Sequence, residues 1–171
     1  MRILTYIEKL PNGLKNSKMA ILETGLVLDG SVLVNKKYYR TEHELDDDLK
    51  GGLLTAVSGF ANEAFDSEFD SFTLQSYKIV AVTDHIELPS GFAKDGRKSK
   101  TLIIFSIVDK DMNDKVVKGC MKQALNQFKA RYSLNDMIRK KFKRFKKFEQ
   151  RFDNIFQDLT LRPEDQFATI F

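Results

Sequence analysis

Cysteine is almost absent from this chain of 171 residues, which contains only Cys120. A single cysteine excludes an internal disulfide framework and favours a reducing compartment. Long hydrophobic runs are also missing, because the most apolar stretch, residues 101–108, is far shorter than the roughly 20 residues of a membrane-spanning helix. The first residues do not read as a signal peptide, since Glu8 interrupts their apolar character at once. We therefore expect a soluble protein of the cytoplasm.

Histidine is equally scarce. The chain has two, His43 and His85, and neither lies in a nucleophile or metal-ligand pattern. A catalytic triad needs a histidine beside a serine or cysteine and a third group that orients it. Cys120 falls on the apolar face of a predicted helix, where a buried structural thiol is the expected role. Nothing here argues for an enzyme or a cofactor, and we expect neither.

Two stretches imitate ligand-binding loops without meeting their requirements. Residues 91–99 approach a phosphate-binding P-loop, but Arg97 stands where the lysine should follow the second glycine, and a strand comes next instead of a helix. Asp109, Asp111 and Asn113 have the alternate spacing of calcium ligands, but the glycine and glutamate needed at the sixth and twelfth positions are missing. We interpret the first as a hairpin loop and the second as helix capping.

Residues 101–108 organise the rest of the chain. Eight residues with almost no polar side chain are typical of a strand that is covered on both faces. Asp29-Gly30 is a strong turn pair and predicts an antiparallel hairpin between its flanking apolar segments. Residues 3–10 fit either a short helix or an edge strand. The other predicted strands and their connection are residues 19–28, 32–39, 72–75 and 77–82, with a long hairpin connection at 87–100.

A helix is predicted over residues 48–65. The acidic run 46–48 suits its start, because carboxylates there complement free N–H groups and the helix dipole. Apolar residues recur three to four apart and predict one face, formed by Leu49, Leu53, Val57, Phe60, Ala61 and Ala64. Gly51, Gly52 and Gly59 each cost about 1 kcal/mol of helix propensity against alanine. We interpret them as points of close approach to the sheet, with a flexible helix start as the alternative.

Two more helices are predicted after the central strand. The first is capped by Asp111 or Asn113, and its shared face consists of Val117, Cys120, Met121, Ala124, Phe128 and Tyr132. Residues 133–136 end it and cap the next. The last helix is predicted to run unbroken over residues 137–159, followed by a short tail. Its apolar stripe consists of Ile138, Phe142, Phe145, Phe148, Phe152, Phe156 and Leu159.

The last predicted helix also carries the chain's positive charge. Residues 139–147 hold seven lysines and arginines and no acid, so the +4 of the whole chain leaves −3 for the remainder. Either these cations form a solvated face opposite a phenylalanine stripe that packs on the sheet or a partner, or they bind acidic protein, membrane headgroups or nucleic acid. The candidate partner-binding residues are Lys140, Lys141, Lys143, Arg144, Lys147, Phe145, Phe148 and Phe152.

The order of elements resembles that of the longin and roadblock (dynein light chain-type) families, which share a profilin-like sheet with helices on its faces. Three segments carry the resemblance: residues 19–30, residues 48–60, and residues 101–109 leading into 113–132. It spans about residues 18–132, within a single domain of 171 residues. The long amphipathic helix predicted after this region makes the chain more similar to longin proteins than to roadblock proteins.

This resemblance implies a fold and a class of function. The expected fold is α/β (α+β), with about five mostly antiparallel strands and helices on both faces. The implied function is that of a non-catalytic scaffold that binds small GTPases, their regulators or another longin/roadblock protein, and that serves membrane traffic. We also expect a homodimer. The alternatives are a module that binds acidic membrane surfaces or nucleic acid through residues 137–159, nucleic acid being the less expected, and a small-molecule-sensing domain.

Overall fold

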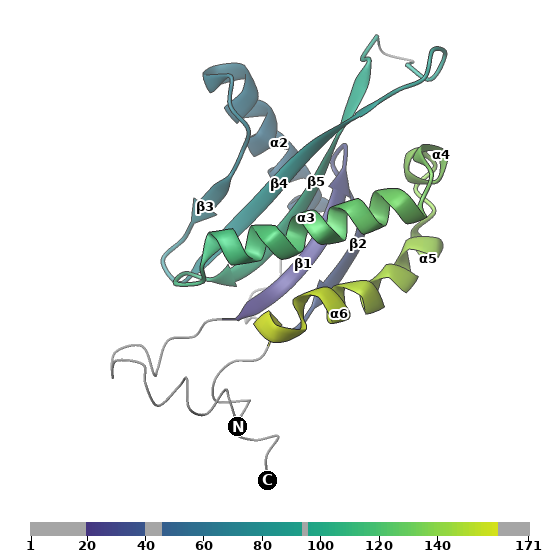
Figure 1. Ribbon diagram of the computed structural model, residues 1–171. Helices are drawn as coiled ribbons and strands as arrows, with labels where there is room; N and C mark the ends of the chain where they lie inside the picture. The colour runs from purple at the N-terminus through teal and green to yellow at the C-terminus, as the bar shows by residue number, and fades with distance from the viewer. Residues whose placement is uncertain (1–19, 40–45, 94–95, 161–171) are drawn as a thin grey trace, which may run out of the picture.

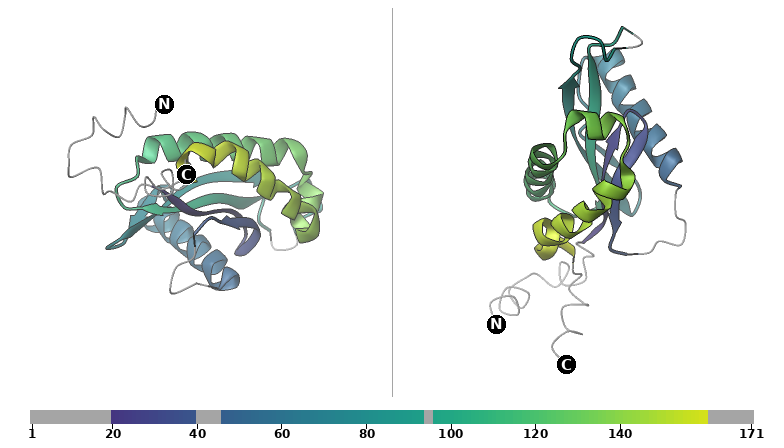
Figure 2. Two further views of the ribbon diagram at one scale, coloured as in Figure 1. Left: turned by 90° about the horizontal axis from the view of Figure 1, so that it is seen from below. Right: turned by 90° about the vertical axis from the view of Figure 1, so that its right-hand side faces the viewer.

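The computed structural model describes residues 20–39, 46–93 and 96–160. Five strands form one antiparallel sheet in the order β2-β1-β5-β4-β3. One helix, α2, covers one face of the sheet, and α3 to α6 cover the other (Figures 1 and 2). The strands are β1 (Ile21–Leu28), β2 (Ser31–Lys37), β3 (Ser71–Thr73), β4 (Tyr77–Glu87) and β5 (Ser99–Asp109). The helices are α2 (Asp47–Phe65), α3 (Asp114–Arg131), α4 (Leu134–Ile138), α5 (Phe142–Phe145), the 3-10 turn η1 (Lys146–Phe148) and α6 (Glu149–Thr160).

The central position of β5 confirms the prediction for residues 101–108. β5 pairs with β1 on one side and with β4 on the other, and residues 102–106 are all buried. Apolar side chains therefore point into both layers of the molecule, which is why this strand does not alternate between apolar and polar residues. The predicted hairpin connection is confirmed as well, since β4 and β5 pair antiparallel up to Glu87 and Ser99.

The hairpin of β1 and β2 turns at Asp29 and Gly30, as predicted. Both residues have a positive φ, 50° and 83°, which is the backbone that a two-residue hairpin turn of the right twist requires. The helix starts are confirmed too: the Asp46 side chain accepts a hydrogen bond from the Asp48 N–H, and the Asn113 side chain accepts from two N–H groups of α3. The prediction for residues 3–10 lies outside the described residues.

The apolar face predicted for α2 is correct for Val57 and Ala61, which pack against the core, and wrong for Leu49, Leu53, Phe60 and Ala64, which are exposed. Lys50, Gly51, Leu54 and Ser58 are the buried residues of this helix, whereas Leu49, Leu53 and Phe60 are exposed. The glycine interpretation holds at Gly51 only, where an added Cβ would lie 2.4 Å from the Gly30 carbonyl oxygen of the β1–β2 turn. At Gly52 and Gly59 the space is open. The close contact at Gly51 sets which side of α2 faces the sheet.

The single helix predicted over residues 137–159 is also wrong. α4 ends at Ile138, Lys140 adopts a left-handed backbone with φ of 50°, and helical structure resumes at Phe142. The break reverses the chain, so that α5, η1 and α6 return antiparallel to α3 on the same face of the sheet (Figure 1). Phe145 thereby enters the interior, and no proline or glycine marks the place.

The two faces of the sheet have cores of unequal size. The core beneath α3 to α6 includes six fully buried or nearly buried aromatic side chains: Phe128, Tyr132, Phe145, Phe148, Phe152 and Phe156. Beneath α2 the buried set is small, with Val27, Leu54, Phe69, Ala81, Ile103 and Phe105. A single helix, α2, therefore covers this face of the sheet and buries few side chains there. The outer side of α2 remains free of partners from the described chain.

Candidate functional site

A positively charged hollow of about 810 Å³ lies where β2, the end of α3, and the segment from α5 to α6 meet. Six cationic side chains line it, together with two carboxylates and two amides. The cations are Lys36, Arg131, Lys143, Lys146, Lys147 and Arg151. The carboxylates are Glu149 and Asp153, and Asp153 already holds Lys36 at 3.4 Å. The hollow therefore has a net charge of +4 and attracts anions.

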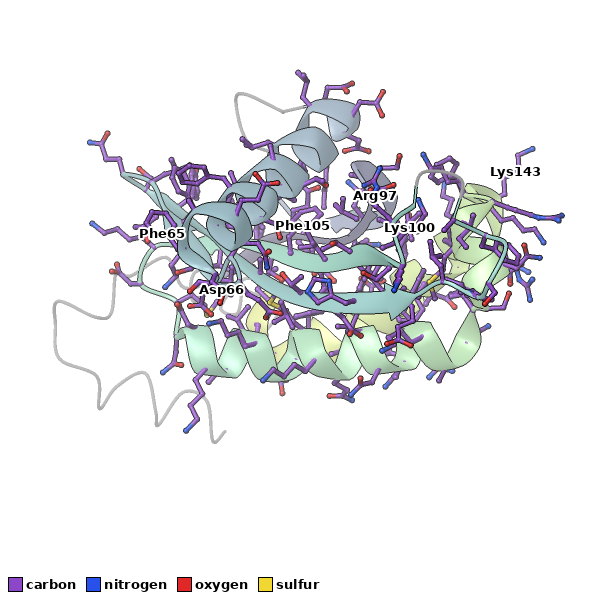
Figure 3. The ribbon with its side chains drawn as sticks, turned by 90° about the horizontal axis from the view of Figure 1, so that it is seen from above. Phe65, Asp66, Arg97, Lys100, Phe105 and Lys143 are labelled. Atoms are coloured by element: carbon purple, nitrogen blue, oxygen red, sulfur yellow. The ribbon has the colours of Figure 1, made fainter. Side chains whose placement is uncertain are left out.

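The five cations proposed from the sequence divide into two groups. Lys143 and Lys147 line the hollow, and Figure 3 shows the Lys143 side chain pointing outward at one end of the molecule. Lys140 donates a hydrogen bond to the Ser31 hydroxyl at 2.7 Å. Lys141 and Arg144 instead pair with the Asp136 carboxylate on α4. Lys140, Lys141 and Arg144 therefore stabilise the chain reversal that follows α4.

Asp136 is the carboxylate that neutralises Lys141 and Arg144 at this reversal. Its two oxygens lie 2.9 Å from Lys141 Nζ and 2.8 Å from Arg144 Nη1, and its side chain is 7% exposed. The hydrogen bond from Lys141 is the main cause that lowers the pKa of the Asp136 carboxyl; the Ser133 hydrogen bond and the positive charges of Arg144 and Lys141 add to it, and burial opposes it. Asp136 thus remains ionised and fixes the chain reversal that follows α4.

The three candidate phenylalanines are core residues, which corrects their assignment to a partner-binding surface. Phe145, Phe148 and Phe152 are 0%, 1% and 0% exposed. Their rings pack edge to face, with centroids 5.1 Å apart for Phe148 and Phe152 and 5.1 Å for Phe148 and Phe128. Of the two alternatives drawn from the sequence, packing of the stripe on its own sheet is the one that the structure supports.

Four cations of the hollow were not predicted as site residues from the sequence: Lys36, Arg131, Lys146 and Arg151. Lys146 belongs to the run of positive charges at residues 139–147, and Arg151 lies one helical turn after Lys147. Both could therefore have been predicted from their neighbours in the sequence. Lys36 and Arg131 come from β2 and α3, and only the fold brings them together.

A second candidate surface is the outer face of α2, which we define by Leu49, Leu53, Phe60 and Phe65. These side chains are 63%, 49%, 63% and 68% exposed, and the rings of Phe60 and Phe65 contact each other at 5.7 Å. Gly52 lies among them with open space above it. Contiguous exposed apolar side chains of this kind mark interaction surfaces.

Acidic residues surround this outer face. Asp46, Asp47 and Asp48 are exposed at one end of α2, and Glu63 and Asp66 are exposed at the other. The one basic residue of the helix, Lys50, is buried. The α2 side of the molecule is thus apolar and negative, while the hollow on the opposite layer is positive. Figure 3 shows Phe65 and Asp66 at one end of the molecule and Lys143 at the other.

A buried polar network holds α2 on the sheet in this orientation. Lys50 Nζ donates to Glu23 Oε1 at 2.6 Å and to Asp47 Oδ1 at 3.2 Å, and it lies 6.0 Å from the centre of the Phe105 ring. The Asn35 amide donates to the same Glu23 oxygen at 2.9 Å. Removing one member of such a pair would leave a buried charge without its partner, which is strongly destabilising. The network therefore keeps the outer face of α2 turned to solvent.

Residues able to do covalent or metal chemistry are dispersed. His85 is half-exposed and lies 3.7 Å from Glu68, while His43 falls outside the described residues. Burial, with a smaller contribution from Asp158, raises the pKa of the Cys120 thiol and so disfavours the thiolate. Over residues 20–39, 46–93 and 96–160, no three His, Cys, Asp or Glu side chains gather as metal ligands. In the same ranges no helix has the length and apolar character to cross a membrane.

Comparison of the chain with protein-family models, with curated proteins and with solved structures gives no match. What the two surfaces can bind is therefore argued from their geometry and charge.

Proposed function

We propose that the protein is a non-catalytic adaptor of the longin/roadblock type that binds another protein, a small GTPase or a regulator of one, through the outer face of α2. The observation that carries this proposal is the unpartnered apolar row on α2, of which Leu49 and Phe60 are each 63% exposed. Complete burial of one such side chain is worth about 1.5–3 kcal/mol, so that covering the row contributes substantially to an association.

The architecture supports the class of protein proposed. A strand pair, a helix, three further strands and a terminal set of helices follow one another, with α2 on one face of the antiparallel sheet and α3 to α6 on the other. This is the arrangement that the resemblance to the longin and roadblock families implies. Binding rather than catalysis is in keeping with an accessible helix face as the principal feature.

The charges around α2 define the partner's chemistry. Asp48 and Glu63 are exposed on the same helix as the apolar row, so a complementary surface combines apolar side chains with lysine or arginine. A second copy docked through the same face would bring carboxylates against carboxylates, which is unfavourable. The proposed partner is thus a different protein, and the homodimer expected from the sequence stays a separate prediction that would use another surface.

The test begins with immobilised full-length chain and its Leu53→Glu/Phe60→Glu variant, used as baits in native cytoplasm. A protein retained by the first and lost by the second is purified, and its dissociation constant is measured at about 50 and 500 mM salt. The proposal expects a small GTPase or GTPase regulator, bound with an affinity that high salt reduces only modestly because apolar contact dominates.

The matched control is Asn62→Glu/Ser67→Glu, which adds the same two charges at exposed positions outside the apolar row. It is expected to bind like the wild type. A partner that binds the Leu53→Glu/Phe60→Glu variant as well as the wild type would contradict the proposal. So would a partner released by salt alone. Light scattering of the same samples reports the oligomeric state.

A further inference from the structure

Most cations of the hollow have no ion-pair partner among the described residues. They share this property with exposed cations such as Lys115 and Lys122, but differ from these in lining one space together. In the part of the chain that the structure describes, Lys78, Lys100, Lys118 and Lys129 each pair with a carboxylate. The five hollow cations other than Lys36 make no such pair with any described residue: Arg131, Lys143, Lys146, Lys147 and Arg151. Their charges therefore remain available for a ligand.

Two arginines line both the hollow and a second, smaller space that adjoins it. Arg131, at the end of α3, and Arg151, in the first turn of α6, together line a smaller recess of about 240 Å³ with Gln127. Ala130 and the buried ring of Phe148 complete the recess. The Phe148 ring packs against Phe128 of α3 and Phe152 of α6, and so fixes the two helices that carry the arginines. A guanidinium group can bind a phosphate through two hydrogen bonds, so two arginines that line one recess suit a phosphate ligand.

The lining favours one class of anion over others. Six cations against two carboxylates call for a ligand that carries several negative charges in a small volume. Binding of a nucleic-acid strand relies on aromatic side chains on which bases stack, and the lining offers only the buried ring of Phe148. An acidic peptide would gain little here beyond charge, because Ala130 and Phe148 are the only apolar residues among those that line the two spaces.

We propose that the hollow bounded by Arg131, Arg151 and the lysines of α5 and η1 binds a compact anion with several phosphate groups, either a free polyphosphorylated molecule or the headgroup of a phosphorylated lipid. Arg131 and Arg151 bind one phosphate in the smaller recess. Lys143, Lys146 and Lys147 neutralise the remaining phosphates in the wider hollow. This activity is independent of the α2 surface and would add a ligand-controlled contact to the adaptor.

The experiment is calorimetric titration of the full chain with inositol hexakisphosphate at about 150 mM salt. We expect saturable binding with one ligand per chain that weakens as salt rises. Arg131→Gln and Arg151→Gln are each expected to weaken binding at least about tenfold, since a hydrogen bond to a charged group is worth that much. Arg131→Lys/Arg151→Lys, which preserves charge, should bind with intermediate affinity.

The matched control is Lys115→Gln/Lys122→Gln, which removes two exposed positive charges of α3 outside the hollow. It should bind like the wild type, as should the Leu53→Glu/Phe60→Glu variant of α2. Melting curves establish that every variant is folded. Equal weakening by the control and by the arginine variants would indicate diffuse attraction and overturn the proposal. Absence of saturable binding would overturn it as well.

Vesicles distinguish the two sources of the phosphates. Neutral phosphatidylcholine vesicles are compared with vesicles that also contain phosphatidylinositol bisphosphate, or phosphatidylserine at equal total charge. Retention on the bisphosphate vesicles alone, lost in Arg131→Gln/Arg151→Gln, supports a lipid headgroup. Binding of inositol hexakisphosphate without retention on any vesicle supports a free molecule. Equal retention on phosphatidylserine would contradict recognition of clustered phosphates.

Discussion

Replacing Phe148 by alanine removes a ring from the centre of the larger core. Phe148 is 1% exposed, and its ring makes edge-to-face contacts with Phe128 and Phe152 at 5.1 Å each. The cavity left by a buried Phe→Ala change costs about 3–5 kcal/mol, a large share of the 5–15 kcal/mol by which a domain is typically stable. For a chain of this length each kcal/mol shifts the melting temperature by about 2–4 °C, so the expected fall is about 6–20 °C.

The assay is thermal melting followed by circular dichroism, beside light scattering. Phe142→Ala is the matched control, because Phe142 begins α5 but is 48% exposed, and its loss should change the free energy of unfolding by no more than about 0.5 kcal/mol. Phe148→Glu should fail to fold, since it buries a charge without a partner. A folded Phe148→Glu variant with an altered oligomeric state would refute the core assignment and restore Phe148 to an interface.

Two further predictions concern α2 and the chain reversal. Gly51→Ala should destabilise the protein by about 1–3 kcal/mol, because its Cβ would meet the Gly30 carbonyl oxygen, whereas Gly52→Ala should stabilise it by about 0.5–1 kcal/mol; equal melting temperatures would contradict the contact at Gly51. The lowered pKa of Asp136 stabilises the fold above the carboxyl's ordinary value of 3.8, and this contribution is lost as pH falls through the lowered pKa. Asp136→Asn should therefore be less stable than the wild type near pH 7, with a difference that shrinks as pH falls below the ordinary carboxyl value of 3.8; a difference that does not shrink on acidification would contradict this.

The features predicted correctly from the sequence depend on short-range chemistry. Asp29-Gly30 dictates its own turn, and Asp46 and Asn113 cap helices through N–H groups two or three residues away. The strand at residues 101–108 is recognisable because burial on both faces leaves little room for polar residues, and its one buried hydroxyl, on Ser106, hydrogen-bonds with Thr24. Each of these signals lies within a few residues of the feature that it specifies.

The orientation of α2 on the sheet could not be predicted from such short-range signals. Leu49, Leu53 and Phe60 predict an inward face by spacing alone, whereas Lys50 and Gly51 look like surface residues. Lys50 is buried because Glu23, 27 residues away, supplies a carboxylate at 2.6 Å. A periodicity argument places a lysine on the surface without knowing its partner, and it therefore rotated the predicted apolar face away from Lys50.

The site was only partly predictable for the same reason. The charge run at residues 139–147 was visible, but which of its cations are free depends on residues elsewhere. Asp136 neutralises Lys141 and Arg144, and Ser31 binds Lys140, so these cations serve the reversal at Lys140. That reversal carries the remaining lysines of the run toward Arg131 of α3 and Lys36 of β2. A run of like charges in a sequence is thus divided by the fold into a structural part and a part available to a ligand, and the division is made by the few carboxylates and hydroxyls that the fold brings within hydrogen-bond distance.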